Sequence, residues 1–468
     1  MPFRPPSRSA LRALLRLALP VIVVQVGLML MGVVDTVMVG HLSSVALAAV
    51  ALGNVYYFGV TIFGMGTLMA LDPVIAHAIG AGDHEGVARD IQRGLILALI
   101  LCIPATMLLW PAPGILAALG QPAEVAPLAG AYARACIPGT LGFFAFTVFR
   151  QSLQALHRVR PLVVTVVLAN MVNLVLNWFL IFGHAGLPAL GAVGSAWAST
   201  ISRLLMAPLL LGLAWPILGV HIRPLRSAAL EPGPLLRQLR IGAPIGAQHQ
   251  LEYGVFAVVG LLMGAMGTAQ VAGHQVALNL ASLTFMVPLG LSASAAVVVG
   301  HAVGRGDRQA ASESARAALY VAVGFMGATA AAFLLWPGPL ARCYTNAPEV
   351  LAVAVTLIPL AGVFQVFDGS QVTSIGLLRG LGDTRTPMLT GILGFWLLGL
   401  PVSLVLGFTL GFGPAGLWWG LVLGLIAVAS VLALRLKHRL RQPLRRVRLD
   451  GAPSLLTEPS GTLPEIEV

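Results

Sequence analysis

The sequence predicts an all-α membrane protein in which twelve transmembrane helices form two six-helix lobes related by a parallel internal repeat. Three observations support this fold class. Hydrophobic residues make up 57% of the 468 residues and charged residues only 10%, and the mean hydropathy is +0.89. A soluble domain carries about a quarter charged residues, so this chain cannot cover a soluble surface. The third observation is that the motif HAIGAGD at 77–83 returns as HAVGRGD at 301–307.

Long apolar stretches recur from one end of the chain to the other. A transmembrane helix needs roughly 20 apolar residues, and these stretches lack the alternation that marks a membrane β-barrel. We therefore expect twelve helical spans. They lie near 15–39, 46–75, 94–112, 127–149, 161–183, 189–215, 240–264, 271–300, 317–337, 350–377, 388–410 and 414–435.

The basic residues orient the chain. There are 28 lysine and arginine residues and the net charge is +11; almost all of them precede the first span, follow even-numbered spans or lie in the tail. The loops on the opposite side hold only Arg342. Basic loops stay in the cytoplasm, so we expect both termini there, with the chain as a monomer in the cytoplasmic (inner) membrane. The basic residues are then explained by the orientation of the chain in the lipid bilayer, and they imply no nucleic-acid partner.

The repeat relates the two halves of the chain. Its two copies are 224 residues apart, from 77 to 301, and the same offset aligns LRLALP at 15–20 with LRIGAP at 239–244. Independent matches at one offset indicate an internal duplication. Each half holds six spans, an even number, so the halves share one orientation about an axis along the membrane normal. The glycines of GAGD and GRGD are expected to form turns at helix ends.

The predicted organisation has five parts. They are a cytoplasmic N-terminal segment (1–14), an N-lobe (15–215), a cytoplasmic inter-lobe linker (216–238), a C-lobe (239–440) and a disordered cytoplasmic tail (441–468). The linker is polar and contains prolines. The tail is basic at first and then rich in Pro, Ser and Glu, a composition that cannot bury a core.

Three carboxylic acids, Asp35, Glu252 and Asp368, lie inside hydrophobic stretches. An ionisable side chain at bilayer depth is costly, and by default it marks an ion, proton or substrate site. Asp72 is a further candidate for the first-lobe path, although its place near the cytoplasmic end of span two leaves its role open. Arg203 either faces lipid and reaches to the membrane interface or pairs with an acid, and both interpretations remain open.

The first lobe offers oxygen ligands around Asp35. Asn173 and Asn177 are four residues apart and share a helix face, and Ser199 and Thr200 add hydroxyl groups on the next span. Carboxylate, amide and hydroxyl oxygens suit a hard cation such as Na⁺. The alternative is that the amides and hydroxyls only link helices by hydrogen bonds. The nearby acid favours a cation site.

Polar residues of the second lobe recur at intervals of three or four. They are Gln248 and Glu252, Gln275 and Asn279, and the series Gln365, Asp368 and Gln371. Two acids that converge in a dehydrated pocket cannot both stay ionised without a large penalty. Such a pair can exchange a proton, or exchange Na⁺ for a cationic substrate. A purely structural pair would need a basic partner at the same depth, for which His249 and His274 are the candidates in these spans.

Three longer segments carry a family resemblance. PVIVVQVGLMLMGVVDTVMVGHLSSVALAAVALGN resembles the first-helix signature of the multidrug and toxic compound extrusion (MATE) family. LEYGVFAVVGLLMGAMGTAQVAGHQVALNLASLTFMVPLGLSASAAVVVGHAVGRGD resembles its seventh and eighth helices in the NorM-like branch. FDGSQVTSIGLLRGLGDTRTPM is similar to the tenth-helix motif of that branch. The resemblance covers all twelve spans.

The resemblance implies two lobes that alternate access and export organic, often cationic compounds against an inward flow of Na⁺ or H⁺. By position, Asp35, Asn173 and Asn177 match the N-lobe cation site, and Glu252 and Asp368 match the C-lobe acid pair. Na⁺ could then bind at either set, and no cofactor beyond the coupling ion is implied. The N-lobe departs from some prokaryotic relatives, which have a second acid where this chain has Asn177.

Two other classes of protein fit less well. A lipid-linked precursor or polysaccharide flippase of a related two-lobed fold would favour a large cationic cavity, whereas the charges at mid-membrane here are mostly acidic. An intramembrane enzyme would need a catalytic constellation, and the spans contain no P-loop, HExxH or Asp-rich diphosphate motif. We therefore predict an antiporter and not an enzyme, with its substrate and its coupling ion left open.

Overall fold

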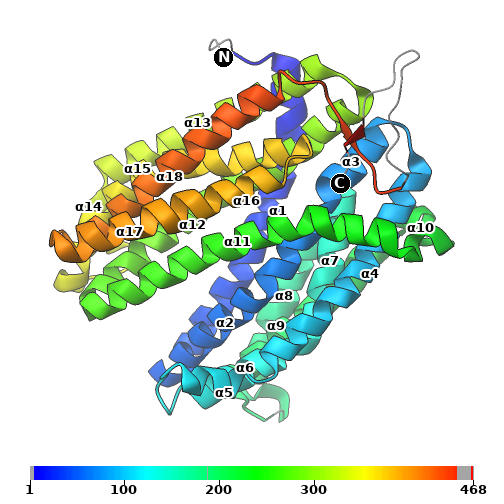
Figure 1. The fold of residues 1–468 in the computed structure, drawn as a ribbon. Helices are drawn as coiled ribbons and strands as arrows, with labels where there is room; N and C mark the ends of the chain where they lie inside the picture. The colour runs from blue at the N-terminus through cyan, green and yellow to red at the C-terminus, as the bar shows by residue number, and fades with distance from the viewer. Residues whose placement is uncertain (1–4, 187, 451–464, 467–468) are drawn as a thin grey trace. The chain divides into compact units, whose positions relative to one another are not determined.

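The computed structural model describes residues 5–186, 188–450 and 465–466, and these are almost entirely helical (Figure 1). Contacts divide the chain into two compact units. The N-terminal unit runs from Val23 to Gly246, and the C-terminal unit combines the residues up to Ile22 with those from Ala247 onward.

Two long helices contribute to both units. Helix α1 (Arg8–Gly40) passes from the C-terminal to the N-terminal unit after Ile22, and helix α11 (Pro232–Met266) passes in the opposite direction after Gly246. Each unit therefore contains part of a helix whose other part belongs to its counterpart.

The two changeover points lie at equivalent places in the repeat, 224 residues apart (22 and 246). Each follows a proline inside the helix, Pro20 in α1 and Pro244 in α11. A proline in a helix removes one backbone hydrogen bond, so both helices are locally weakened just before the changeover. The predicted lobes, 15–215 and 239–440, follow whole spans, whereas the contacts divide the chain within helices.

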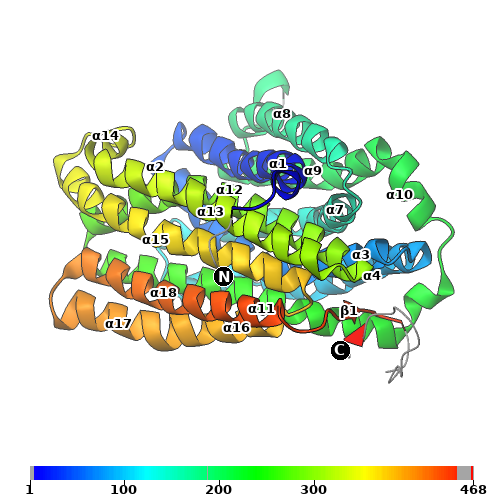
Figure 2. The same ribbon diagram turned by 90° about the horizontal axis from the view of Figure 1, so that it is seen from above.

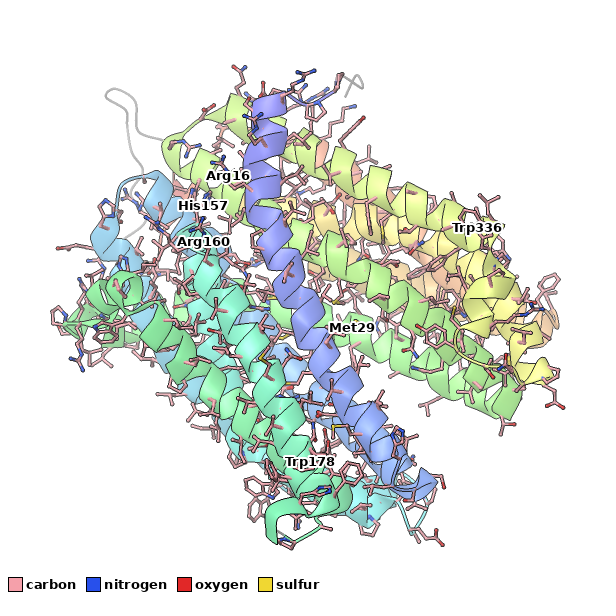
Figure 3. The ribbon with its side chains drawn as sticks, turned by 180° about the vertical axis from the view of Figure 1, so that it is seen from behind. Arg16, Met29, His157, Arg160, Trp178 and Trp336 are labelled. Carbon is pink, nitrogen blue, oxygen red and sulfur yellow. The ribbon has the colours of Figure 1, made fainter. Side chains whose placement is uncertain are left out.

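The rest of the N-terminal unit is a bundle of long and short helices. They are α2 (Ser44–Leu68), α3 (Leu71–Gly80), α4 (His84–Leu109), α5 (Ala112–Ala118), α6 (Ala126–Ala135), α7 (Ile137–Ala155), α8 (Arg160–Phe182), α9 (Gly191–Leu213) and α10 (Trp215–Ile222), with the short turns η1 (His184–Gly186) and η2 (Ser227–Leu230). Arg160 and Trp178 lie towards opposite ends of α8 (Figure 3). A basic residue at one end of a span and a tryptophan at the other is typical of a helix that crosses a membrane.

The C-terminal unit continues after α11 with a second bundle. Its elements are α12 (Thr268–Arg305), α13 (Arg308–Leu335), α14 (Pro337–Arg342), α15 (Pro348–Gly380), α16 (Arg385–Gly391), η3 (Ile392–Gly399), α17 (Leu400–Leu404), η4 (Val405–Thr409), α18 (Gly413–Arg439), β1 (Arg446–Val447) and β2 (Glu465–Ile466). The two short strands pair in parallel.

The predicted spans all correspond to helices. Within the described residues, ten helices are long and apolar enough to cross a membrane, and the bent pair α6–α7 raises the number to eleven. Among the ten are the broken span Ser44–Gly80 and the composite span Arg385–Thr409. The remaining predicted span, 240–264, lies in α11, which has 35 residues. Polar side chains such as Gln248 and Glu252 lower the hydropathy of that helix.

The repeated motif builds the same turn in both units. Gly82 and Gly306 have φ values of 73° and 74°, in the left-handed region that favours glycine. Asp83 and Asp307 follow them, and each side chain accepts a hydrogen bond from the backbone N–H three residues later, at 2.8 and 2.9 Å. These contacts cap the N-termini of α4 and α13. The predicted turn glycines are therefore confirmed.

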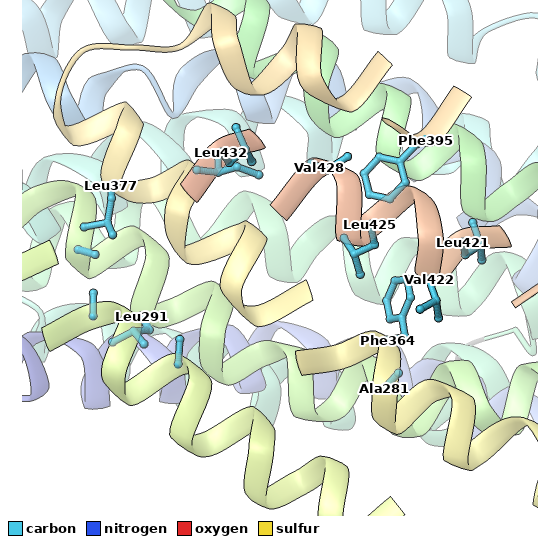
Figure 4. Packing of buried hydrophobic residues seen from close by; sticks show 14 of the residues in the cluster. Ala281, Leu291, Phe364, Leu377, Phe395, Leu421, Val422, Leu425, Val428 and Leu432 are labelled. Atoms are coloured by element: carbon cyan, nitrogen blue, oxygen red, sulfur yellow. The ribbon is translucent and has the colours of Figure 1, made fainter. Parts of the chain in front are cut away.

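Helices α12, α15 and α18 form the core of the C-terminal unit, where they run side by side (Figures 1 and 2). Apolar side chains such as Phe364 and Leu425 fill the space between them (Figure 4). Gly376 of α15 lies against the backbone of Ser292 in α12, and Ser292 Oγ donates to the carbonyl of Val372 at 2.6 Å. A small residue at this point lets the two helices approach closely.

Part of the predicted disordered tail is packed. Residues 451–464 and 467–468 of the segment 441–468 lie outside the described residues. In the described part, Leu444, Val447 and Leu449 are buried. These apolar side chains are covered in spite of the basic residues between them.

Adding a methyl group at Gly376 tests the contact between α12 and α15. Gly376→Ala would force the new Cβ against the backbone and hydroxyl of Ser292, and overpacking of this kind typically costs about 1–3 kcal/mol. We expect the midpoint of thermal unfolding of the purified protein in detergent to fall by several degrees. Gly327→Ala in α13 is the matched control, because a Cβ there meets nothing within 4 Å. Equal midpoints for the two variants would contradict the prediction.

Candidate functional site: acids and their partners in two helical units

In the N-terminal unit, Asp35 is surrounded by three hydrogen-bond donors. Asn173 Nδ2 and Asn177 Nδ2 donate to Asp35 Oδ1 at 3.2 and 2.6 Å, and Ser199 Oγ donates to Asp35 Oδ2. Asp35 is 5% exposed and the other three side chains are fully buried. Three helices therefore position one carboxylate: α1 supplies the acid, α8 the two amides and α9 the hydroxyl.

The spacing of the two asparagines explains the local geometry. Asn173 and Asn177 are one turn apart on α8, so their side chains share a face. Asn177 Nδ2 also donates to Asn173 Oδ1 at 3.1 Å, and Asn173 Nδ2 lies 3.4 Å from Ser199 Oγ. The amides and the hydroxyl form one connected network that stabilises the negative charge of Asp35.

This Asp35 cluster has the groups that a hard cation requires. Asn177 Oδ1 is buried and has no hydrogen-bond partner among the described residues. A buried acceptor without a donor is unfavourable unless a proton donor or a cation completes it. Amide side chains can also turn by 180°, which presents oxygen where nitrogen now lies. The same side chains can therefore donate through nitrogen to a bare carboxylate or bind a cation through oxygen.

Thr200 does not join the Asp35 cluster. Its hydroxyl donates to the carbonyl of Ala135 at 2.8 Å and links α9 to α6. The prediction that both hydroxyls surround Asp35 is therefore correct for Ser199 and wrong for Thr200. Adjacent residues on a helix point about 100° apart, so only one of them can face the acid.

Asp72 belongs to a separate buried network in the same unit. It lies in the first turn of α3, directly after the break in the span, and is fully buried. Gln151 Nε2 of α7 donates to Asp72 Oδ2 at 3.1 Å. The neighbouring Arg150 interacts electrostatically with Asp72 and donates to Gln25 Oε1 of α1 at 3.0 Å. Asp72 is thus held by two polar residues of α7.

In the C-terminal unit, Glu252 of α11 is held by two glutamines. Gln248 Nε2 and Gln371 Nε2 donate to Glu252 Oε1 at 3.3 and 2.7 Å. His249 Nδ1 lies 3.8 Å from Glu252 Oε2, and the Glu252 side chain is 23% exposed. Gln248 lies four residues before Glu252 on α11, and Gln371 belongs to the series on α15 whose members are three residues apart. The two predicted polar stripes therefore meet at the carboxylate of Glu252.

Asp368 lies within electrostatic reach of Glu252. Glu252 has glutamine donors, whereas Asp368 accepts no hydrogen bond from the residues that the structure describes. A carboxyl group without donors in a largely dehydrated setting is stabilised by taking up a proton or by a cation. We call these two residues the Glu252–Asp368 pair.

The basic neighbours of this pair differ from those expected. His274 is not a partner for the acids, because its Nδ1 accepts the indole N–H of Trp418 at 3.2 Å. His249 does contact Glu252. Arg379, which the sequence places near the cytoplasmic end of span ten, is buried and within electrostatic reach of both Glu252 and His249. Sequence reasoning missed this arginine because it lies at the boundary of the apolar stretch.

The other predicted polar residues of the C-terminal unit form two separate contacts. Gln275 Nε2 lies 3.5 Å from Asn279 Oδ1 on an exposed part of α12, so these two residues bond to each other and not to the acids. Thr284 Oγ1 lies 2.7 Å from Gln365 Oε1 and 2.9 Å from the carbonyl of Ala281. One hydroxyl proton cannot serve both acceptors, so the Gln365 amide is better placed with its nitrogen towards Thr284.

That orientation leaves an amide oxygen of Gln365 buried one turn from Asp368 on α15, with no donor among the described residues. Thr284 was not among the predicted residues. Its only signal in the sequence is a hydroxyl residue within the apolar run LASLTFMV.

The fold and these two sets of residues define a multi-pass α-helical membrane protein with acid-centred polar sites in both units. Comparison with known proteins agrees with this class. The MatE family model matches residues 20–179 and 244–405, once in each half of the chain.

Two curated relatives match nearly the whole chain. The "Probable multidrug resistance protein NorM" of Mesorhizobium japonicum is 35% identical over 92% of this chain and 94% of its own length. The "Multidrug resistance protein MdtK" of Cronobacter sakazakii is 36% identical over 94% of this chain and 98% of its own length. The chain therefore belongs to the MatE family, the multidrug and toxic compound extrusion family that its sequence resembles.

Solved structures show the same fold. The crystal structure of the eukaryotic MATE transporter AtDTX14 matches with a TM-score of 0.85 and 24% identity, over 92% of this chain and 98% of that one. An outward-facing multidrug resistance MATE transporter matches with a TM-score of 0.83 and 21% identity, over 92% and 96% of the two chains. The predicted fold class is confirmed. Members of the family are transporters, which supports the prediction that this chain is not an enzyme.

Two serines on α9 provide a test of the Asp35 cluster. Ser199 donates to Asp35, whereas Ser202 donates to the carbonyl of Ala198 in its own helix, and both are buried. A hydrogen bond to a charged group contributes about 1.5–3 kcal/mol. Ser199→Ala should therefore shift the cation dependence of transport about tenfold or more, and Ser202→Ala should leave it unchanged.

The measurement is the half-maximal Na⁺ concentration and the midpoint pH of dye transport by each variant. A proton site that loses this donor binds its proton more tightly, and a Na⁺ site that loses this ligand binds Na⁺ more weakly. The direction of the shift therefore identifies the ion. Curves for Ser199→Ala and Ser202→Ala that superimpose would show that the hydroxyl of Ser199 has no such role.

Proposed function

We propose that this chain is a secondary active antiporter that exports organic, often cationic compounds in exchange for inward Na⁺ or H⁺, by alternating access of its two lobes. It would act as a monomer in the cytoplasmic (inner) membrane with both termini in the cytoplasm. Two relatives of similar length are named as multidrug resistance proteins, which supports small organic compounds as the substrates. The one-sided distribution of the basic residues supports the orientation.

The observation that carries this proposal is the Glu252–Asp368 pair. Two carboxyl groups within electrostatic reach in a membrane-spanning unit repel each other when both are ionised. A proton, a sodium ion or a cationic compound relieves the repulsion. Each ligand can therefore displace another, and competition of this kind is enough to couple two transport steps.

The Asp35 cluster supplies a second place for the coupling ion. Its carboxylate, amide and hydroxyl groups match the preference of a hard cation for oxygen ligands. Asp35 would hold the ion directly, with Asn173, Asn177 and Ser199 as the other ligands. The Glu252–Asp368 pair is the alternative location for the same ion.

Neutralising either acid of the pair tests the proposal. Glu252→Gln and Asp368→Asn remove the charge but keep the shape, so each should reduce transport to the level of vesicles without the protein. The measurement is uptake of a fluorescent cationic dye into inverted membrane vesicles. Glu349→Gln is the matched control, because Glu349 is an exposed acid in the first turn of α15. Full transport by both site variants, at normal membrane levels, would contradict the role of the pair.

Separate ion gradients identify the coupling ion. In inverted vesicles the lumen corresponds to the outside of the cell, so high lumenal Na⁺ or an acidic lumen should drive dye inward. We expect one gradient alone to drive uptake when the other is abolished. An absence of uptake under each imposed gradient would contradict antiport.

A further inference from the structure

Arg203 lies one turn beyond Ser199 on helix α9. Residues four apart on a helix share a face, so Arg203 is on the side of α9 from which Ser199 donates to Asp35. The guanidinium group is within electrostatic reach of Asp35. The structure records no ion pair between them, so the charge acts on the Asp35 cluster from outside its hydrogen-bond network.

Aromatic rings hold the guanidinium group in place. Arg203 Cζ lies 4.5 Å from the ring centroid of the buried Tyr57 and 5.8 Å from that of Phe143. These are cation–π distances. Arg203 Nη1 is buried and has no hydrogen-bond partner among the described residues. Arg203 is therefore a half-buried residue that stacks on aromatic rings of α2 and α7.

Backbone packing also fixes this residue. Gly142 of α7 lies directly against the backbone of Arg203 and Leu204, where any side chain would clash. Gly139, one turn earlier on α7, lies against Thr200. The segment of α9 that carries Arg203 is therefore packed directly against α7.

Phenol and thiol groups also lie around Asp35, and such groups ordinarily carry no charge at neutral pH. Tyr57 of α2, Tyr132 of α6 and Cys136 at the end of α6 are the phenol and thiol groups that interact with Arg203, and Tyr132 and Cys136 also interact with Asp35. An arginine stays protonated in proteins. Within the described residues, Arg203 is thus the charged group that balances Asp35 electrostatically before any cation arrives.

We propose that Arg203 is a specificity-determining residue that weakens cation binding at the Asp35 cluster and favours monovalent over divalent cations. The inference rests on the proposed function, in which this cluster can bind the coupling cation. Repulsion between the fixed guanidinium and a bound cation scales with the charge of the cation. A divalent ion therefore meets twice the repulsion that Na⁺ or H⁺ meets. A monovalent ion is held loosely enough to leave when access changes.

The test uses two substitutions at one position. Arg203→Gln removes the charge, and Arg203→Lys keeps it while losing the planar group that stacks on Tyr57. Each is measured in the Glu252→Gln background, which removes one acid of the pair in the other unit. The readouts are equilibrium binding of radioactive Na⁺, competition by Ca²⁺ and proton uptake by the purified protein in lipid nanodiscs.

Removal of the charge should strengthen cation binding about tenfold. This is the effect of the Coulomb repulsion between the guanidinium group and the bound cation when they are roughly one to two helical turns apart in a medium of intermediate dielectric constant. This means half-saturation at about a tenth of the Na⁺ concentration, or proton uptake at higher pH. Ca²⁺ should gain still more. Arg203→Lys should bind as the parent does.

Three results would overturn the inference: unchanged binding in Arg203→Gln, an equal shift in Arg203→Lys, or a shift that persists when Asp35→Asn is added. Arg203→Met, which keeps the apolar stem, replaces Arg203→Gln if the latter does not purify as a folded monodisperse protein. Dye transport is measured separately, on protein that keeps Glu252. A binding shift in the Glu252→Gln background, with no dye transport by the protein that keeps Glu252, rejects only the proposed function. Unchanged binding together with normal transport by the protein that keeps Glu252 rejects only this inference.

Discussion

The carboxylate of Asp35 accepts hydrogen bonds from two amides and a hydroxyl in a part of the chain where bulk water does not supply donors. A carboxylate at bilayer depth survives only if the protein replaces its hydration. Much of the surrounding structure follows from this requirement. Three helices, α1, α8 and α9, must converge on one point, and Arg203, one turn from Ser199 on α9, is held against the rings of Tyr57 and Phe143.

The duplicated scaffold carries unlike sites. The repeat builds the same glycine turn and the same aspartate cap in both units, and the chain changes units at equivalent points, 22 and 246. The acids do not follow it: at the 224-residue offset Asp35 aligns with Val259, and Glu252 with Leu28. One unit provides Asp35 with two amides and a hydroxyl as its hydrogen-bond donors, and the other provides a pair of acids. A shared backbone can therefore support two different responses to a cation.

Prediction from the sequence was most successful where a local property, hydropathy or helical spacing, decides the outcome. The twelve apolar stretches became helices because backbone groups in lipid must bond within their own segment. It placed Asn173 and Asn177 correctly because helical spacing alone puts them on one face. It failed for Thr200, whose hydroxyl turns to Ala135, and it missed Thr284 and Arg379. Each of these depends on which neighbouring helix lies opposite, which local spacing does not specify.

The sequence by itself determined the class of protein, its spans, its internal repeat and the acids at bilayer depth, because hydropathy and the penalty for buried charge are local properties. Only the tertiary structure decided which groups complete each acid. It gave Asp35 its donors from α8 and α9, left Asp368 within electrostatic reach of Glu252, and placed Arg203 on the ring of Tyr57. Hydrogen bonds and Coulomb interactions act over a few ångströms between helices far apart in the chain, so their partners are known only once those helices pack.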